Sequence, residues 1–166
     1  MLRIQPYRPY DAQTILPWIG DEKAFYFWSA DRYDRYPITP QDVNALYIRE
    51  EAQGPFYPMS VYDGKNMVAH FILRCPAAEK PEELRLGFVI LDPDYRGQGF
   101  GKEFVRQAVE YAFASMGAKR ITLGVFRENE AAYGCYRACG FAETGAVREC
   151  RCMGETWQSV EMEIAR

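Results

Sequence analysis

The sequence predicts a mixed α/β fold, and three observations lead to this prediction. Strand-like runs alternate with two segments of amphipathic helical spacing in the second half of the chain. An Asp63-Gly64 step between two such runs favours a hairpin, and therefore antiparallel neighbours. The order strand, helix, strand over residues 84–126 requires a crossover connection and parallel neighbours. We therefore expect a central, mostly antiparallel sheet flanked by helices.

In the first half of the chain, two helix starts are predicted around an aromatic segment. Residues 2–4 alternate like a strand, Asp11 is placed to cap a helix that continues through Trp18, and Thr39 is placed to cap another. Pro40 suits the first position of that second helix. Aromatic residues crowd positions 25–36 without a clear period. Loose packing over a pocket and a helix pair that fills the core both remain open for this segment.

The second half of the chain predicts the remaining elements of the sheet. Strands are expected over residues 56–62, 67–73, 84–91, 121–126, 141–147 and 157–164, and helices over 99–116 and 129–139. The run 84–91 reads as the buried central strand. Gly117 and Gly140 are placed to end the two helices.

Length and composition predict one domain over residues 1–166. The chain is 48% hydrophobic and 26% charged, which is ordinary for a globular core. No apolar run approaches the roughly 20 residues that cross a bilayer, and the first residues lack the apolar core of a secretory signal. We therefore expect a cytoplasmic protein with no membrane partner. A net charge of −3 without a dominant basic cluster argues against nucleic-acid binding.

The cysteine and histidine pattern predicts free thiols and no metal site. Five cysteines form an odd set without a CxxC pair, and there is a single histidine. Cys150 and Cys152 would share one face of a strand, but two thiolates alone do not complete a metal site. We expect this pair to be structural.

A glycine-rich turn between the central strand and the following helix is the most informative segment. It comprises Arg96, Gly97, Gln98, Gly99, Phe100, Gly101 and Lys102. The glycines let the backbone approach a ligand closely and aim consecutive N–H groups at it. The helix N-terminus and the two cations add positive charge, so the turn is suited to phosphate oxygens, and in particular to a pyrophosphate.

Two common nucleotide motifs do not fit this turn. A P-loop needs GxxxxGK followed by Ser or Thr, but Glu103 follows Lys102. A dinucleotide fingerprint needs GxGxxG, and Lys102 stands where the third glycine belongs. A glycine-rich turn without any ligand is the remaining alternative.

Two motifs resemble those of a known family. Arg96-x-x-Gly99-x-Gly101 resembles the acetyl-CoA pyrophosphate motif of the GNAT superfamily of N-acetyltransferases. Asn129-x-x-Ala132-x-x-x-Tyr136-x-x-x-Gly140-Phe141 resembles a later motif of the same superfamily. The likeness covers residues 84–147. Within the superfamily, the segment 86–93 is most similar to the branch that contains ribosomal-protein alanine acetyltransferases.

The resemblance implies an acetyl-CoA site between two splayed parallel strands. The backbone of Val89, Ile90 and Leu91 would bind the pantetheine arm, with the Leu91 N–H polarising the thioester carbonyl. Tyr136 would donate a proton to the leaving thiolate, and Asn129 would hold the cofactor or an adjoining water. The structural alternatives are a helix cap for Asn129 and a packed amphipathic residue for Tyr136.

The acceptor half of the site departs from the resemblance. Arg85 stands where the similar branch commonly has a Glu base, so Glu83, two residues earlier on the same strand face, is our candidate base. His70 is a second candidate. We expect Arg85 to recognise a carboxylate or phosphate on the acceptor. The aromatic stretch from Trp18 to Tyr36 lies where this superfamily shapes the acceptor pocket.

The resemblance predicts an acetyl-CoA-dependent N-acetyltransferase that needs no metal. The acceptor would be a primary amine of a small molecule or a peptide N-terminus, which attacks directly in a ternary complex. A non-catalytic acyl-CoA-binding module that serves as a sensor or partner is the alternative. A homodimer is also left open.

Overall fold

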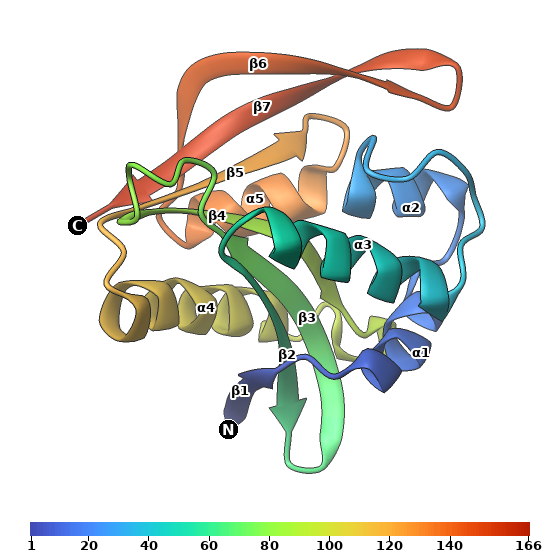
Figure 1. Ribbon diagram of the computed structural model, residues 1–166, viewed down its shortest axis with the longest axis horizontal. Coiled ribbons are helices and arrows are strands. Elements are labelled where there is room, and N and C mark those ends of the chain that lie inside the picture. The colour runs from blue at the N-terminus through green and yellow to red at the C-terminus, as the bar shows by residue number, and fades with distance from the viewer.

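The computed structural model describes residues 1–166 and contains a seven-stranded sheet (Figure 1). The strands are β1 (Leu2–Pro6), β2 (Phe56–Asp63), β3 (Asn66–Arg74), β4 (Glu83–Leu91), β5 (Arg120–Phe126), β6 (Ala142–Cys152) and β7 (Glu155–Ala165), in the order β1-β2-β3-β4-β5-β7-β6. Only β4 and β5 pair in parallel, and all other neighbours are antiparallel. The predicted fold class and the central place of β4 are confirmed.

Five α-helices cover the two faces of the sheet. They are α1 (Ala12–Ile15), α2 (Glu22–Ser29), α3 (Pro40–Gln53), α4 (Phe100–Met116) and α5 (Glu130–Ala138). Helices α1 to α3 share one hydrophobic core with one face of β2, β3 and β4, and helices α4 and α5 share the other core. None of these helices is long and apolar enough to span a membrane.

The helix starts follow local chemistry at α3 but not at α1. Thr39 caps α3 as predicted, because its side chain accepts from the Asp42 N–H and Asp42 returns the bond to the Thr39 N–H. The prediction that Asp11 caps a continuous helix to Trp18 is wrong. Asp11 itself has helical dihedrals, and its buried carboxylate instead accepts from the Arg8 N–H and the Ser60 hydroxyl. The segment forms short 3₁₀ turns on either side of α1.

A β-bulge in β4 changes which side chains face which helical layer. Ile72 of β3 pairs with Gly87, but His70 pairs with Ile90, so β4 carries one extra residue there. Before the bulge, Leu84 and Leu86 pack on the α4 side; after it, Phe88 and Ile90 pack against α1 to α3. Phe88 has φ of 46°, which is an unfavourable backbone conformation for a bulky residue. Strained conformations of this kind cluster at functional sites.

Beyond their first residues, β4 and β5 separate. Only Glu83–Arg85 of β4 pair with Arg120–Thr122 of β5, and beyond these residues the two strands do not pair with each other. The predicted splayed pair is therefore present. The splay leaves one edge of β4 from Leu86 onward without sheet hydrogen bonds on the side that faces β5.

The β6–β7 hairpin is longer than the sequence predicts and projects beside α2 (Figure 1). Its turn uses Met153 and Gly154, both at positive φ, as a two-residue hairpin turn requires. Methionine is not a typical residue for this position, so the sequence carried no signal for the turn. Cys150 and Cys152 lie on one face of β6 and pack in a small core with Phe126 and Trp157, which is a structural role.

Candidate active site

A cavity with a volume of about 450 Å³ lies where β4 and β5 separate, and we call it the larger cavity because a smaller one adjoins it. Its wall is mostly apolar and comes from β4, β5, α2, α4, α5 and the glycine-rich turn. Most of the predicted cofactor residues line it: Val89, Ile90, Leu91, Arg96, Gly97, Gly101, Asn129 and Tyr136. Gln98, Gly99 and Lys102 lie beside the cavity without lining it.

The free edge of β4 presents backbone donors to this cavity. The Asp92 N–H donates to the Val68 carbonyl across the β3 side. Because successive N–H groups of a strand point to opposite edges, the Leu91 N–H faces the gap toward β5. The Leu91 carbonyl on the same edge accepts from the Arg96 guanidinium at 2.9 and 3.1 Å. The edge thus offers the kind of donor that was predicted for Leu91.

The glycine-rich turn brings the start of α4 to the mouth of the cavity. Gly97 and Gly99 have φ of 74° and 87°, and Gly99 immediately precedes the first residue of α4. A Cβ on Gly101 would contact Leu91 and Cys135 at 3.8 and 3.9 Å, so any larger side chain would enter the cavity. The first N–H groups of α4 have no helical acceptor and carry the positive end of the helix dipole.

The polar side chains of the turn have distinct positions. Arg96 lines the cavity but folds back onto the carbonyls of Leu91 and Trp18. Gln98 donates to the Asp94 carbonyl at 2.8 Å and so stabilises the turn itself. Lys102 is exposed in the first turn of α4. An apolar channel that leads to a helix N-terminus with a nearby Arg and Lys fits a long acyl carrier that ends in a pyrophosphate.

Tyr136 reaches the cavity from α5. Its ring packs edge-on against Phe141, with centroids 5.9 Å apart, and burial raises the pKa of its phenol well above the usual value. The hydroxyl therefore stays protonated at neutral pH and can donate a proton.

Asn129 precedes α5 and also lines the cavity. Its side chain makes no capping hydrogen bond to the helix. The structure therefore gives no support to the alternative in which Asn129 is only a helix cap.

Cys135 is a cavity residue that the sequence analysis did not single out. It lies on α5 next to Tyr136, and burial raises the pKa of its thiol to about 11. At neutral pH it is a thiol rather than a thiolate, and thus a weak nucleophile. An acyl-enzyme on this cysteine is therefore disfavoured.

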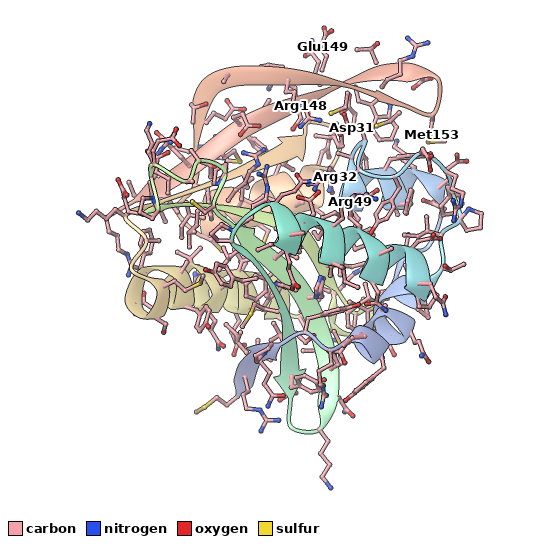
Figure 2. All side chains as sticks on the ribbon, in the orientation of Figure 1. Asp31, Arg32, Arg49, Arg148, Glu149 and Met153 are labelled. Carbon is pink, nitrogen blue, oxygen red and sulfur yellow. The ribbon has the colours of Figure 1, made fainter.

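A smaller cavity of about 120 Å³ adjoins the larger one, and we call it the arginine-lined cavity. The two cavities share part of their walls: Phe27, Trp28, Leu86, Gly87, Phe88 and Gly124. Four arginines line the smaller cavity: Arg32, Arg74, Arg85 and Arg148. Figure 2 shows Asp31, Arg32 and Arg148 close together where the segment after α2 meets the β6–β7 hairpin. The first part of the aromatic segment forms the end of α2, up to Ser29, and its Phe27 and Trp28 line both cavities.

Arg85 lies in the arginine-lined cavity, but its guanidinium is already held. Its two terminal nitrogens contact the two carboxylate oxygens of Glu161 at 2.6 and 2.9 Å. This bidentate pair fixes the side chain across β5 toward β7. The structure therefore gives no support to the predicted substrate-binding role of Arg85 as a free fork.

The two candidate bases from the sequence are not at either cavity. Glu83 pairs with Arg120 at 3.1 Å and Lys80 at 3.7 Å at the far end of β4, so the structure gives its predicted catalytic role no support. His70 is completely buried, with Nε2 2.7 Å from the Tyr47 hydroxyl, and burial lowers its pKa to about 3. It is therefore a neutral core residue outside both cavities.

Sequence reasoning missed Arg32, Arg74, Arg148 and Gly124. These residues belong to segments far apart in the chain, and the sheet order brings them together. No local motif marks any of them. Only their position relative to Arg85 in the fold identifies them.

Comparisons with known proteins follow this geometry. Residues 20–141 match the model of the acetyltransferase (GNAT) family. A spermidine N(1)-acetyltransferase of Vibrio cholerae is 34% identical over 61 residues, which cover 37% of this chain and 35% of that relative, so the match spans about a third of its length. The N-alpha-acetyltransferase RimI of Mycobacterium tuberculosis is 26% identical over 104 residues, 63% of each protein. The crystal structure of spermidine N-acetyltransferase from Vibrio cholerae with CoA and spermine superimposes with a TM-score of 0.81 at 22% identity, covering 99% of this chain and 95% of that one.

Proposed function

The chain belongs to the acetyltransferase (GNAT) family, and from that premise we propose that it transfers the acetyl group of acetyl-CoA to a primary amine. One observation carries the proposal. The cavity between the separated strands β4 and β5 brings together the free strand edge, the glycine-rich turn and Tyr136.

The residues of the larger cavity suit acetyl-CoA. The N–H groups at the start of α4, with Arg96 and Lys102 nearby, would bind the pyrophosphate, and the free edge of β4 at Val89 and Leu91 would bind the pantetheine amides. The apolar wall would take the remainder of the arm. Bound there, acetyl-CoA supplies an activated thioester carbonyl.

The transfer we propose is a direct attack. The Leu91 N–H holds the carbonyl oxygen as charge develops on it. The neutral amine nitrogen forms a bond to the acetyl carbon while the C–S bond breaks, and Tyr136 donates its phenolic proton to the departing sulfur. The nitrogen, now bonded to the acetyl group, then releases its extra proton through water, and this proton restores the Tyr136 phenol. A thiol at Cys135 with a pKa of about 11 supports direct attack over a covalent enzyme intermediate.

The proton lost by the amine goes to water in this proposal. None of the residues that line the larger cavity is Asp, Glu or His. An alkylammonium has a pKa near that of lysine, about 10.4, so it must lose a proton before it attacks. Glu83 receives no part in this step because Arg120 and Lys80 hold its carboxylate away from the cavity.

The names of the matched relatives support an amine acceptor. Spermidine is an amine, and the matched relative and the superimposed structure are named for its acetylation. These names give no support to a peptide N-terminus. The homodimer stays a prediction.

The test is acetyl-CoA turnover by the purified protein. CoA thiol release and the mass of the acetylated product are followed with a panel of primary amines, and acetyl-CoA binding is measured by calorimetry in parallel. Turnover with at least one amine supports the proposal. Tight acetyl-CoA binding without turnover on any amine favours the non-catalytic acyl-CoA-binding module, and absence of acetyl-CoA binding contradicts both.

A further inference from the structure

We infer that the arginine-lined cavity selects an acceptor that carries an anionic group, a carboxylate or a phosphate, in addition to its amine. The inference rests on the proposed function and specifies the substrate class of that site. It follows from the place of the cavity, from the charges in its wall and from the one arginine that has no carboxylate partner.

The place of the cavity is suited to the acceptor. It lies on the face of β4 that carries Arg85 and Gly87, and it meets the larger cavity at Gly87, Phe88 and Gly124. The Leu91 N–H and Tyr136 border the larger cavity. A small molecule anchored among the arginines would therefore extend its other end toward the proposed thioester site.

The charges of the wall leave one positive group without compensation. Three of the four arginines are paired inside the protein: Arg32 with Glu50, Arg85 with Glu161, and Arg148 with Asp31. Arg74 has no carboxylate within ion-pair distance. The protein thus holds one unpaired guanidinium in the wall of a small cavity.

Arg74 lies in an unfavourable environment for a lone cation. It is directly opposite Arg85 in the β3–β4 register. Burial lowers the pKa of its guanidinium, and the positive charges of Arg85 and Arg32 lower it further; the Glu50 carboxylate, which pairs with Arg32, raises it by less. Partly buried charges in proteins normally have partners, because an unpaired one loses hydration without a compensating contact. A bound anion would supply the missing partner and accept a bidentate pair of hydrogen bonds.

The ion pairs of the neighbouring arginines leave Arg74 as the arginine that is available to bind an anion. Arg85 crosses directly over Gly124, where a Cβ would lie 2.9 Å from its Nη2 atom and 2.9 Å from the Ser159 hydroxyl. Glycine at this position therefore permits the Arg85–Glu161 pair, which keeps Arg85 from competing as a free cation. The volume of about 120 Å³ suits a group as small as a carboxylate.

The same wall is unsuited to a polycation. Asp31 is the only carboxylate among the lining residues, and Arg148 contacts both of its oxygens at 2.7 and 2.8 Å. A polyamine entering from this side would meet guanidinium groups without an available carboxylate. This protein should therefore differ in acceptor choice from the relatives that are named for spermidine acetylation.

The experiment compares amines that differ only in an anionic group. The kcat/KM values for acetyl transfer are measured with β-alanine against propylamine, with O-phosphoethanolamine against ethanolamine, and with spermidine. The first pair tests a carboxylate and the second a phosphate. The wild-type protein should prefer the anionic member of at least one pair by about tenfold or more, as expected for a charge-assisted contact, and should use spermidine poorly.

Two variants connect the preference to Arg74. Arg74→Gln removes the unpaired charge and should reduce the anionic-to-neutral ratio to near one. Arg151→Gln removes the same charge from an exposed position on β6 outside both cavities and should leave the ratio unchanged. Circular dichroism and thermal melting establish that both variants are folded. Calorimetric binding of β-alanine and O-phosphoethanolamine to the CoA-loaded protein provides a readout independent of turnover.

The outcomes separate this inference from the proposed function. Turnover that prefers spermidine or the neutral amines, or a ratio that Arg74→Gln does not change, overturns the inference and leaves acetyl transfer standing. Absence of turnover together with anion binding that depends on Arg74 overturns the proposed transfer and supports the anion site. Absence of both turnover and anion binding overturns both.

Discussion

The two cavities that meet at the β4 bulge are built in different ways. The larger one is formed mainly by backbone and apolar side chains: a free strand edge, a helix N-terminus and glycines that clear space. The arginine-lined cavity carries long charged side chains from β3, β4, β6 and the segment after α2, and ion pairs hold all of its arginines except Arg74 of β3. The first construction depends on local backbone geometry, and the second depends on contacts between distant segments.

Under the proposed function, this difference separates the part of the site that would bind acetyl-CoA from the part that would bind the acceptor. Backbone donors bind the constant part of a ligand whatever the neighbouring side chains are. Side-chain charges select the variable part and can be changed one substitution at a time. The predictions below test this division, from the largest expected effect to the smallest.

Tyr136→Phe tests the chemistry of the larger cavity. Loss of the phenolic proton donor should lower kcat by about 100-fold or more, as for other positioned general acids. The ring that packs on Phe141 is retained. Calorimetry should therefore show acetyl-CoA binding within about twofold of wild type. A kcat equal to that of wild type would remove Tyr136 from the mechanism.

Acid should act on the helical layer that carries the arginine-lined cavity. His70 contacts Tyr47 of α3 and has a pKa of about 3 in the fold, below its ordinary 6.5. The unfolded chain gains the proton as pH falls through 6.5, and the folded chain only near 3, so stability is lost progressively in that window. The loss should be about 2 kcal/mol at pH 5.

The check is urea unfolding between pH 4 and 8 with wild type and His70→Gln. The variant should be less stable than wild type near pH 8, because it loses the contact between His70 and Tyr47, and the difference between the two proteins should shrink as pH falls. A difference that is constant with pH would contradict the assignment of His70 as a neutral core residue.

Gly124→Ala tests whether the position of Arg85 matters to the acceptor side alone. The added methyl group would approach Arg85 Nη2 and the Ser159 hydroxyl at 2.9 Å, so the Arg85–Glu161 pair must shift. The KM for the preferred acceptor should change by about three- to tenfold, the loss expected for one charge-assisted contact. The KM for acetyl-CoA should change less. Equal changes in the two KM values would show that the two cavities are not separable in this way.

Arg74→Met should raise the melting temperature slightly. The substitution removes a partly buried cation that faces Arg85 and Arg32, while the long apolar side chain keeps the packing. Residues that serve a binding site commonly lower the stability of the folded protein, so replacing them can raise it. Differential scanning calorimetry should detect an increase of a few degrees. A clear decrease would mean that Arg74 has a stabilising contact and no need of a ligand.

Local chemistry made the larger cavity predictable from the sequence. Asp63-Gly64 indicated the hairpin, Thr39 and Asp42 indicated the start of α3, and the spacing of Arg96, Gly99 and Gly101 indicated a phosphate-binding helix start. Each of these signals lies within a few residues, and each predicts the local backbone structure directly. The roles of Tyr136 and Leu91, in contrast, were predicted only from the resemblance to the GNAT superfamily, whose second motif covers Asn129 to Phe141.

The acceptor side could not be predicted in this way. The sequence marks Arg85 as a candidate, but it does not predict that Glu161 of β7, 76 residues away, binds its guanidinium. The sequence likewise marks Glu83 as a candidate base, but it does not predict that Arg120 of β5 pairs with its carboxylate. Both interactions depend on which strands are neighbours in the sheet, and the spacing of residues within one segment does not predict that. Asp11 is a smaller example, since Ser60 on β2 engages the carboxylate that was expected to cap a helix.

The central claim is that acetyl-CoA binds where β4 and β5 separate, independently of the arginines on the acceptor side. Calorimetric titration of acetyl-CoA into wild type, Gly101→Phe and Arg74→Gln tests it most directly. Gly101 faces Leu91 and Cys135, so a phenylalanine there would fill the entrance to the cavity. We predict one site per chain in wild type and Arg74→Gln with similar affinity, and at least about 100-fold weaker binding in Gly101→Phe, the loss of roughly 2.7 kcal/mol. Equal binding to wild type and Gly101→Phe would contradict the claim.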